Sequence, residues 1–286
     1  MWKGSLVALV TPMKSDGMMD FVTLKKLLEW HALEQTDGIV LLGTTGESPT
    51  IREHERAQII KLAVEVCRGQ LPIIVGTGAN CTYHAIEMTK QAYELGADAV
   101  LLVTPYYNKP TQEGLFQHFS AIAKAVPIPQ ILYNIPSRTA CDMLPETVAR
   151  LAQLKNIMAI KETVSDLARL AQIQALCDID IFSGDDIRAL GYIRQGAKGV
   201  ISVAANLIPR AMHDLCVAAL SGDWKKADEI DAKYRRFFEL LFVETNPIPT
   251  KWAMFEMGLI EAGIRLPLTP LNARYHADLR AALQQL

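Results

Sequence analysis

The sequence lacks the features that mark several large classes of protein. Its longest apolar runs are short, such as residues 6–10 and 99–103, whereas a membrane-spanning helix needs about 20 apolar residues. Lys and Arg total 29 against 31 Asp and Glu, with no basic run. That balance argues against nucleic acid or an anionic membrane as the main partner. The apolar stretch before Thr11 is too short for a signal peptide, so we expect a cytoplasmic protein.

Signatures of metals and nucleotide cofactors are also missing. The five cysteines are scattered and never form a C-x-x-C pair, which is typical of reduced thiols rather than disulfides or zinc ligands. The six histidines form neither H-x-H nor H-E-x-x-H, so we expect no metal site. No G-x-G-x-x-G follows an apolar run and no Walker motif occurs, which argues against a nucleotide cofactor.

Short apolar segments recur along the first two thirds of the chain. They begin near residues 5, 38, 72, 98, 129, 157, 179 and 198, a spacing of about 28 residues that suits a strand plus a crossover helix. Continuous runs such as residues 100–103 favour parallel strands buried on both faces. Apolar residues between the runs follow helical spacing, as in residues 115–123. Eight such units predict an α/β fold, the (β/α)8 TIM barrel.

Gly96 and Gly196 lie in similar stretches, where glycine suits a left-handed helix cap before the next strand.

The last part of the chain has a different pattern. After residue 203 the pattern predicts helices over residues 206–220, 223–243, 247–258 and 272–286. The first would close the barrel. We therefore predict a barrel over residues 1–222 and a C-terminal helical appendage over residues 223–286.

Candidate site residues follow the predicted strands, because the chemistry of such barrels lies at the carboxyl ends of the strands. Residues 43–48, G-T-T-G-E-S, could hold a small anion such as a carboxylate, or form a polar turn. Paired tyrosines in residues 104–110 could transfer protons or pack at an interface. Arg138 could bind a carboxylate, although taken alone it suits a surface arginine. Asp185 and Asp186 suit a helix N-cap better than a metal site.

Lys161 gives the clearest chemical signal. It ends the apolar run I-M-A-I-K-E at residues 157–162. By strand alternation it points opposite to Ile160, so it faces the barrel interior if Ile160 packs under the helices. Desolvation there disfavours the ammonium form and frees an amine that can attack a carbonyl. The alternative is a solvated lysine at a strand end, which the apolar flanks disfavour.

Taken together, these loops resemble the dihydrodipicolinate synthase family. The motif G-T-T-G-E and the lysine of the sixth strand mark the wider superfamily of pyruvate-dependent class I aldolases. The stretches T-P-Y-Y-N-K-P-T-Q-E-G-L and Y-N-I-P-S-R-T are more specific. The resemblance runs from Gly4 to the P-I-P stretch at residues 247–249. It implies a (β/α)8 barrel with C-terminal helices and a homotetramer built as a dimer of dimers.

The resemblance also implies roles for single residues. Lys161 corresponds to the Schiff-base lysine and Tyr133 to the general acid/base. Thr45 corresponds to the hydroxyl that links Tyr133 to Tyr107 in a relay that transfers protons, and Thr44 corresponds to the residue beside Thr45 in this relay. In the family, the tyrosine at the position of Tyr107 comes from the neighbouring subunit across the tight dimer interface. The expected substrate-binding residues are Thr45, Arg138, Gly184 and Ile201. Arg138 would hold the carboxylate of the second substrate. The loop before Gly184 is slightly shorter than in some members.

The implied reaction condenses pyruvate with L-aspartate-4-semialdehyde in lysine and diaminopimelate biosynthesis. The lysine provides the electron sink, so neither a metal nor a cofactor is required. One alternative is a related Schiff-base lyase that acts on N-acetylneuraminate or a 2-keto-3-deoxy sugar acid. Arg138 argues against this alternative, because it suits a short substrate whose carboxylate lies near the aldehyde. Another is a non-catalytic barrel that binds a keto acid, which the presence of every catalytic residue disfavours.

Feedback by lysine is the point where the sequence departs from the family. Sensitive members bind lysine in a cleft at the tight dimer interface. Sensitive members carry an acid at the position of His84 and histidines at those of Glu53 and Arg56. His84 cannot supply the lost negative charge, and Arg56 adds a positive charge that repels lysine. Glu53 could partly compensate. We therefore predict weak or absent inhibition. The matching cleft positions in this chain are Ser48, Pro49, Glu53, Arg56, Asn80, His84 and Tyr106.

Overall fold

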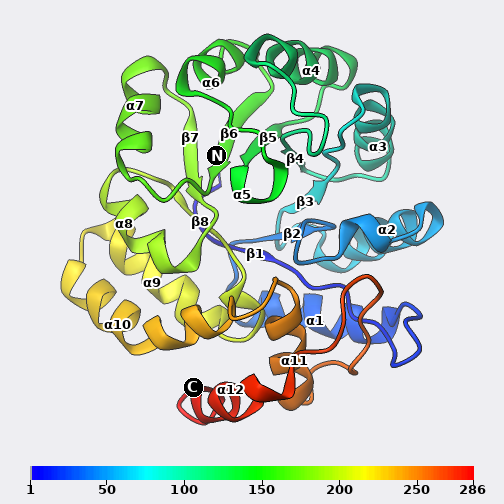
Figure 1. Cartoon of the computed structure of the whole chain (residues 1–286), viewed down its shortest axis with the longest axis vertical. Coiled ribbons are helices and arrows are strands. Elements are labelled where there is room, and N and C mark those ends of the chain that lie inside the picture. Colours follow the sequence, from blue (N-terminus) through cyan, green and yellow to red (C-terminus); the bar gives the residue numbers. More distant parts are fainter. Residues whose placement is uncertain (1) are drawn as a thin grey trace.

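Eight parallel strands close into a barrel in the computed structural model, which describes residues 2–286 (Figure 1). Each strand pairs with its neighbours in chain order, and β8 pairs with β1. The predicted (β/α)8 barrel is therefore confirmed. The strands are β1 Gly4–Ala8, β2 Gly38–Leu41, β3 Ile73–Gly76, β4 Ala99–Val103, β5 Gln130–Asn134, β6 Ile157–Glu162, β7 Asp180–Ser183 and β8 Gly199–Ser202.

Helices lie between the strands and surround the barrel (Figure 1). Gly96 and Gly196 have φ values of 89° and 94°, which confirms their predicted left-handed conformation at helix ends. The helices up to β8 are α1 Phe21–Leu33, η1 Ser48–Thr50, α2 Glu53–Cys67, α3 Thr82–Glu94, α4 Gln112–Ala125, α5 Pro136–Thr139, α6 Pro145–Leu151, α7 Ala168–Leu176, η2 Asp186–Arg188 and α8 Ala189–Arg194, the η elements being 3-10 helices.

The seam between β1 and β8 depends on two glycines. Gly4 pairs with Gly199, and Gly199 has a φ of 153°. A Cβ atom on Gly199 would lie 1.9 Å from the carbonyl oxygen of Gly4. A side chain therefore cannot be placed at residue 199 without moving β8 away from β1, because closure of the barrel brings the two backbones together here.

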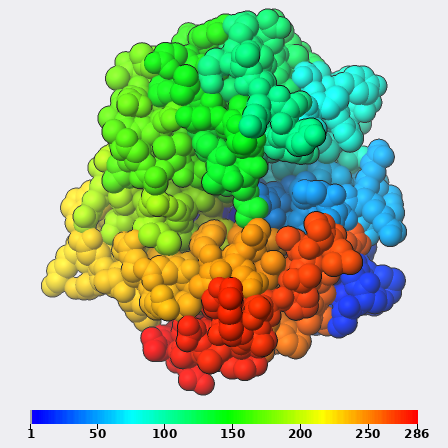
Figure 2. All heavy atoms as spheres, in the orientation of Figure 1, coloured from blue at the N-terminus to red at the C-terminus, as the bar shows by residue number. Residues whose placement is uncertain are grey.

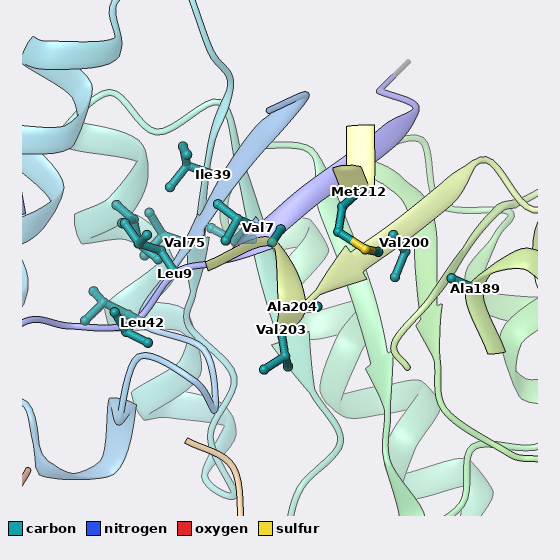
Figure 3. Packing of buried hydrophobic residues seen from close by; sticks show 14 of the residues in the cluster. Val7, Leu9, Ile39, Leu42, Val75, Ala189, Val200, Val203, Ala204 and Met212 are labelled. Carbon is teal, nitrogen blue, oxygen red and sulfur yellow. The ribbon is translucent and has the colours of Figure 1, made fainter. Parts of the chain in front are cut away.

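Two separate apolar layers result from strand alternation. The smaller layer fills the barrel and includes Leu6, Ala159 and Ile201. The larger layer lies between the strands and the helices and includes Val200 and Ile160. Figure 3 shows part of this outer layer, with Met212 of α9 (Pro209–Ser221) pointing toward Val200 of β8. Since each strand is buried on both faces, its sequence is a continuous apolar run rather than an alternating one.

Helices follow β8 to the end of the chain and cover one side of the barrel (Figure 1). α9 packs on β1 and α10, and α12 packs on α10 and α11. In Figure 2 the orange segment of this region faces the green β5 region across a hollow. Among residues 2–286, no helix is long and apolar enough to cross a membrane. The elements are η3 Ala204–Asn206, α9 Pro209–Ser221, α10 Trp224–Leu240, α11 Ile248–Glu256, η4 Ala273–Tyr275 and α12 His276–Leu283.

Candidate active site

Lys161 and Tyr133 lie side by side at the carboxyl ends of β6 and β5. The two residues are register partners, and the Lys161 Nζ atom lies 4.3 Å from the centre of the Tyr133 ring. Each residue is only 5% exposed. Ala159 belongs to the layer inside the barrel and Ile160 to the layer outside it. The side chain of Lys161 therefore faces the barrel interior, as alternation along the strand predicts.

Gly184 provides space for this lysine. A Cβ atom at residue 184 would lie 2.8 Å from Lys161 Cε and 2.4 Å from Thr163 Cγ2. Ile201 is fully buried in the layer inside the barrel, below the end of β8. The structure thus gives two of the expected pocket residues a steric role: Gly184 by its lack of a side chain, and Ile201 as part of the apolar floor.

The loop after β2 carries the two threonines at different depths. Thr44 lines a cavity of about 970 Å³ that also reaches Gly43, Tyr133 and Arg138. Thr45 is 2% exposed, and its Oγ1 atom accepts a hydrogen bond from Asn246 Nδ2 at 3.0 Å. Of the two threonines, Thr44 is therefore the one that lines the cavity together with Tyr133. Thr45 is fixed by this hydrogen bond from Asn246, which lies in the segment before α11.

A buried ion pair fixes the same loop from the C-terminal region. Glu47 adopts a left-handed conformation, with a φ of 55°, and its side chain is 1% exposed. Lys251 Nζ donates to Glu47 Oε1 at 2.5 Å and to the carbonyl oxygen of Thr11 at 3.0 Å. The backbone N–H of Arg265 donates to Glu47 Oε2 at 3.1 Å. Because a left-handed non-glycine residue is strained, the loop depends on these contacts.

Arg138 lies at the entrance of the cavity. It is exposed, and its NH2 group donates to the carbonyl oxygen of Asn246 at 3.0 Å. The arginine follows β5 in the short helix α5, so the carboxyl end of the barrel aims it toward the same space as Thr44 and Tyr133. A guanidinium here is available to a ligand carboxylate, as its place in the sequence suggests.

Tyr107 stands apart from this group within the single chain. Its side chain is 89% exposed and its φ is 76°. Among residues 2–286 the cavity lining includes Tyr106 but not Tyr107. A large aromatic residue held in a left-handed conformation and left in solvent is unusual, because both features are unfavourable without a partner.

Six of the seven residues matched to the lysine cleft line the same cavity, and Asn80 is not among its lining residues. Ser48, Glu53, Arg56, His84 and Tyr106 all line it, together with Pro49. The carbonyl oxygen of Asn80 accepts a hydrogen bond from Asn108 at 2.8 Å.

Arg56 is buried in this wall of the cavity. It donates to Ser48 Oγ at 3.0 Å and to the carbonyl oxygen of Gly76 at 2.6 Å. Burial lowers its pKa to about 10, so the guanidinium stays charged at neutral pH.

Asp185 and Asp186, the acidic pair after β7, accept hydrogen bonds from backbone N–H groups. Asp185 caps η2 by accepting from the N–H of Ile187 at 3.0 Å, which confirms the predicted N-cap. Asp186 accepts from the N–H groups of Val203 and Ala204, and burial raises its pKa to about 6. Within the described residues, no group of three or more His, Cys, Asp or Glu side chains is placed to hold a metal ion.

Asn246, Glu47 and Lys251 are site residues that the sequence analysis did not single out as partners. Their contacts join residues more than 200 positions apart. The only sequence signals were the glutamate in G-T-T-G-E and the start of a predicted helix near residue 247. Neither signal pairs one segment with the other.

A buried lysine beside a tyrosine at the carboxyl end of a (β/α)8 barrel defines a lyase of the class I aldolase type, in which lysine attacks a carbonyl. The model of the dihydrodipicolinate synthetase family matches residues 1–286, and this chain belongs to that family.

Relatives of high identity cover the whole chain. The 4-hydroxy-tetrahydrodipicolinate synthase of Coxiella burnetii (strain RSA 493 / Nine Mile phase I) is 57% identical over 286 residues, which are 100% of this chain and 99% of that protein. The corresponding synthase of Nitrosococcus oceani is 55% identical over 287 residues, covering 100% of this chain and 98% of that one.

Solved structures agree with this assignment. The chloride-inhibited dihydrodipicolinate synthase from Acinetobacter baumannii, complexed with pyruvate, superposes with a TM-score of 0.98 at 51% identity, covering 100% of this chain and 99% of that one. The dihydrodipicolinate synthase from Aquifex aeolicus gives a TM-score of 0.97 at 44% identity, covering 99% and 98%. The resemblance found in the loop motifs is therefore confirmed.

Proposed function

We propose that this chain is a 4-hydroxy-tetrahydrodipicolinate synthase, which condenses pyruvate with L-aspartate-4-semialdehyde in lysine and diaminopimelate biosynthesis. The observation that carries the proposal is the buried amine of Lys161, which lies 4.3 Å from the ring centre of Tyr133, and Tyr133 in turn lines the cavity that Arg138 borders. A keto acid can reach the amine, and a second carboxylate can be held at the entrance.

The first half of the reaction makes a nucleophile from pyruvate. The amine of Lys161 attacks the ketone carbon, and water leaves as the iminium forms. The iminium withdraws electrons, so a proton leaves the methyl group and an enamine results. Tyr133 is the general acid/base for these transfers, which such groups accelerate by about 10²–10⁴-fold.

The second half forms the carbon–carbon bond and releases the lysine. The enamine carbon attacks the aldehyde carbon of the semialdehyde, whose carboxylate pairs with Arg138. The amine of that substrate then attacks the iminium carbon and displaces Lys161, which closes the ring. Holding both substrates in one cavity converts their encounter into an intramolecular step.

We propose that Thr44 provides the hydroxyl of the proton relay beside Tyr133, a role that the family resemblance gives to Thr45. Thr44 lines the cavity together with Tyr133, and Thr45 does not; the oxygen of Thr45 accepts from Asn246. Thr45 then belongs with the donors that hold the pyruvate carboxylate. Gly184 and Ile201 shape the space around the lysine.

We further propose a cytoplasmic homotetramer, a dimer of dimers in which Tyr107 enters the relay of a neighbouring subunit. Its 89% exposure and left-handed backbone support a role that the single chain does not complete. One relative, 41% identical, is described as the first monomeric dihydrodipicolinate synthase variant. An active isolated monomer would contradict the role of Tyr107. We keep residues 1–222 as the barrel and 223–286 as the C-terminal helical region.

Borohydride trapping tests the proposal. Wild-type protein treated with pyruvate and borohydride should gain one covalent adduct on Lys161, and Lys161→Ala should gain none. Lys155→Ala is the matched control, because Lys155 is exposed just before β6. An adduct on another lysine would refute the assignment. Product formation that requires the semialdehyde distinguishes the synthase from a sugar-acid lyase, and absence of trapping would leave only a binding protein.

A further inference from the structure

Asn246 connects the two loops that hold the proposed substrates. It is 4% exposed and lies just before α11. Its side-chain Nδ2 donates to Thr45 Oγ1 at 3.0 Å, and its backbone carbonyl oxygen accepts from Arg138 NH2 at 3.0 Å. One residue of the C-terminal region therefore touches the loop after β2 by its side chain and the loop after β5 by its backbone.

The orientation of the Asn246 amide is fixed by a second contact. Thr250 Oγ1, fully buried one turn further along the chain, donates to Asn246 Oδ1 at 3.3 Å. With its oxygen occupied in this way, the amide presents its N–H group to Thr45. A threonine hydroxyl has one proton and two lone pairs. Since Thr45 Oγ1 accepts from Asn246, its own proton remains free for another acceptor.

We propose that Asn246 is a positioning residue that holds the Thr45 hydroxyl as a hydrogen-bond donor to the carboxylate of pyruvate. The inference rests on the proposed function, because that function brings a keto acid to this loop. Thr45 is 2% exposed, so its hydroxyl group cannot donate a hydrogen bond to bulk water. A buried donor with a fixed direction is worth more to an anion than one that rotates freely.

The surroundings keep this arrangement rigid. Lys251, on the helix that follows Asn246, fixes Glu47 two residues beyond Thr45 through the contact of 2.5 Å. Thr11 Oγ1 donates to the carbonyl oxygen of Gly46 at 2.7 Å. The loop is thus held on both sides of Thr45, and the side chain of Asn246 sets only the direction of the hydroxyl.

Asn246→Asp tests this idea with almost no change of shape. The carboxylate keeps an acceptor for Thr250 and leaves the backbone contact to Arg138 intact, but it cannot donate to Thr45, which must then donate to it. We expect the pyruvate concentration for half-maximal borohydride trapping to rise about ten- to a hundredfold. The KM for the semialdehyde should change by less than about twofold, because Arg138 retains its backbone partner.

Asn246→Leu removes the donor without adding charge and should also raise the pyruvate requirement. Lowering the pH should restore trapping by Asn246→Asp relative to Asn246→Leu, because a protonated carboxyl group regains a donor. Asn272→Asp makes the same chemical change at an exposed cap and serves as the control.

Either of two results would overturn the inference: unchanged pyruvate dependence in Asn246→Asp, or a defect in Asn246→Asp that Asn246→Leu lacks, which would indicate charge repulsion alone. A rise in semialdehyde KM without a change in pyruvate dependence would also overturn it. Failure of wild-type protein to trap pyruvate would instead refute the proposed function, so the two failures are distinguishable.

Discussion

Replacing Lys251 with methionine should destabilise the protein by about 3–5 kcal/mol, because the change leaves the carboxylate of Glu47 buried without its ion partner. The two side chains are 5% and 1% exposed, and their charged atoms are 2.5 Å apart. Burial lowers the pKa of Lys251 while Glu47 opposes that shift. Methionine keeps most of the volume of the lysine stem, so the loss reflects charge rather than a cavity.

Thermal and urea unfolding measure this effect. Unfolding entropy of about 2.1 cal/mol/K per residue converts the loss to a fall in Tm of roughly 5–8 °C for a chain of this size. Lys25→Met is the matched control: Lys25 and Glu29 form an exposed pair at 3.8 Å, so we expect a change below about 0.5 kcal/mol.

A double-mutant cycle decides whether the pair itself is responsible. Adding Glu47→Gln to Lys251→Met neutralises the orphaned carboxylate and should recover more than half of the lost stability. If the double variant is as unstable as the sum of the two single variants, the ion pair is not the source of the effect. A Lys251→Met protein with the stability of wild type would refute the reasoning altogether.

The remaining predictions concern a substrate clamp, acid stability and feedback. Arg138→Ala should raise the semialdehyde KM about ten- to a hundredfold and leave pyruvate trapping intact; loss of trapping would end its role as second-substrate clamp. Burial lowers the pKa of His31 to about 3, so the unfolded chain binds a proton that the folded chain rejects. His31 alone should therefore contribute a fall in stability of about 1.4 kcal/mol per pH unit between about pH 6 and pH 3.5, so in urea titrations His31→Gln should lose less stability than wild type over this range. Millimolar L-lysine should inhibit weakly or not at all in steady-state assays, because His84 supplies no negative charge; strong inhibition would identify Glu53 as the substitute partner.

Much of the fold could be predicted because its signals are local. Each strand of the barrel contains a short apolar run, and the inward direction of Lys161 follows from alternation with Ile160, as the separate layers of Ala159 and Ile160 confirm. Helix ends were less accurate. The helix predicted over residues 206–220 begins at Pro209, because a 3-10 turn over Ala204–Asn206 first satisfies the backbone after β8.

The rest of the site could not be predicted because it depends on contacts between distant segments. Asn246 reaches Thr45 across 201 positions of the chain, and Lys251 reaches Glu47 across 204. Nothing local to G-T-T-G-E indicates which of its two threonines faces the cavity. The left-handed backbone of Tyr107 is likewise not encoded by a glycine or asparagine at that position.

The anchoring of the loop after β2 has a consequence for synthesis of the protein. Residues 43–48 are translated some 200 residues before their partners Asn246 and Lys251. At about 5–20 residues per second, that interval lasts roughly 10–40 s. A growing chain that ends at residue 222 already contains all eight strands, yet its loop has no ion pair and Thr45 has no amide donor. Such a chain should hold Lys161 in an unfinished pocket. Catalytic competence then arises at the end of translation rather than when the barrel closes.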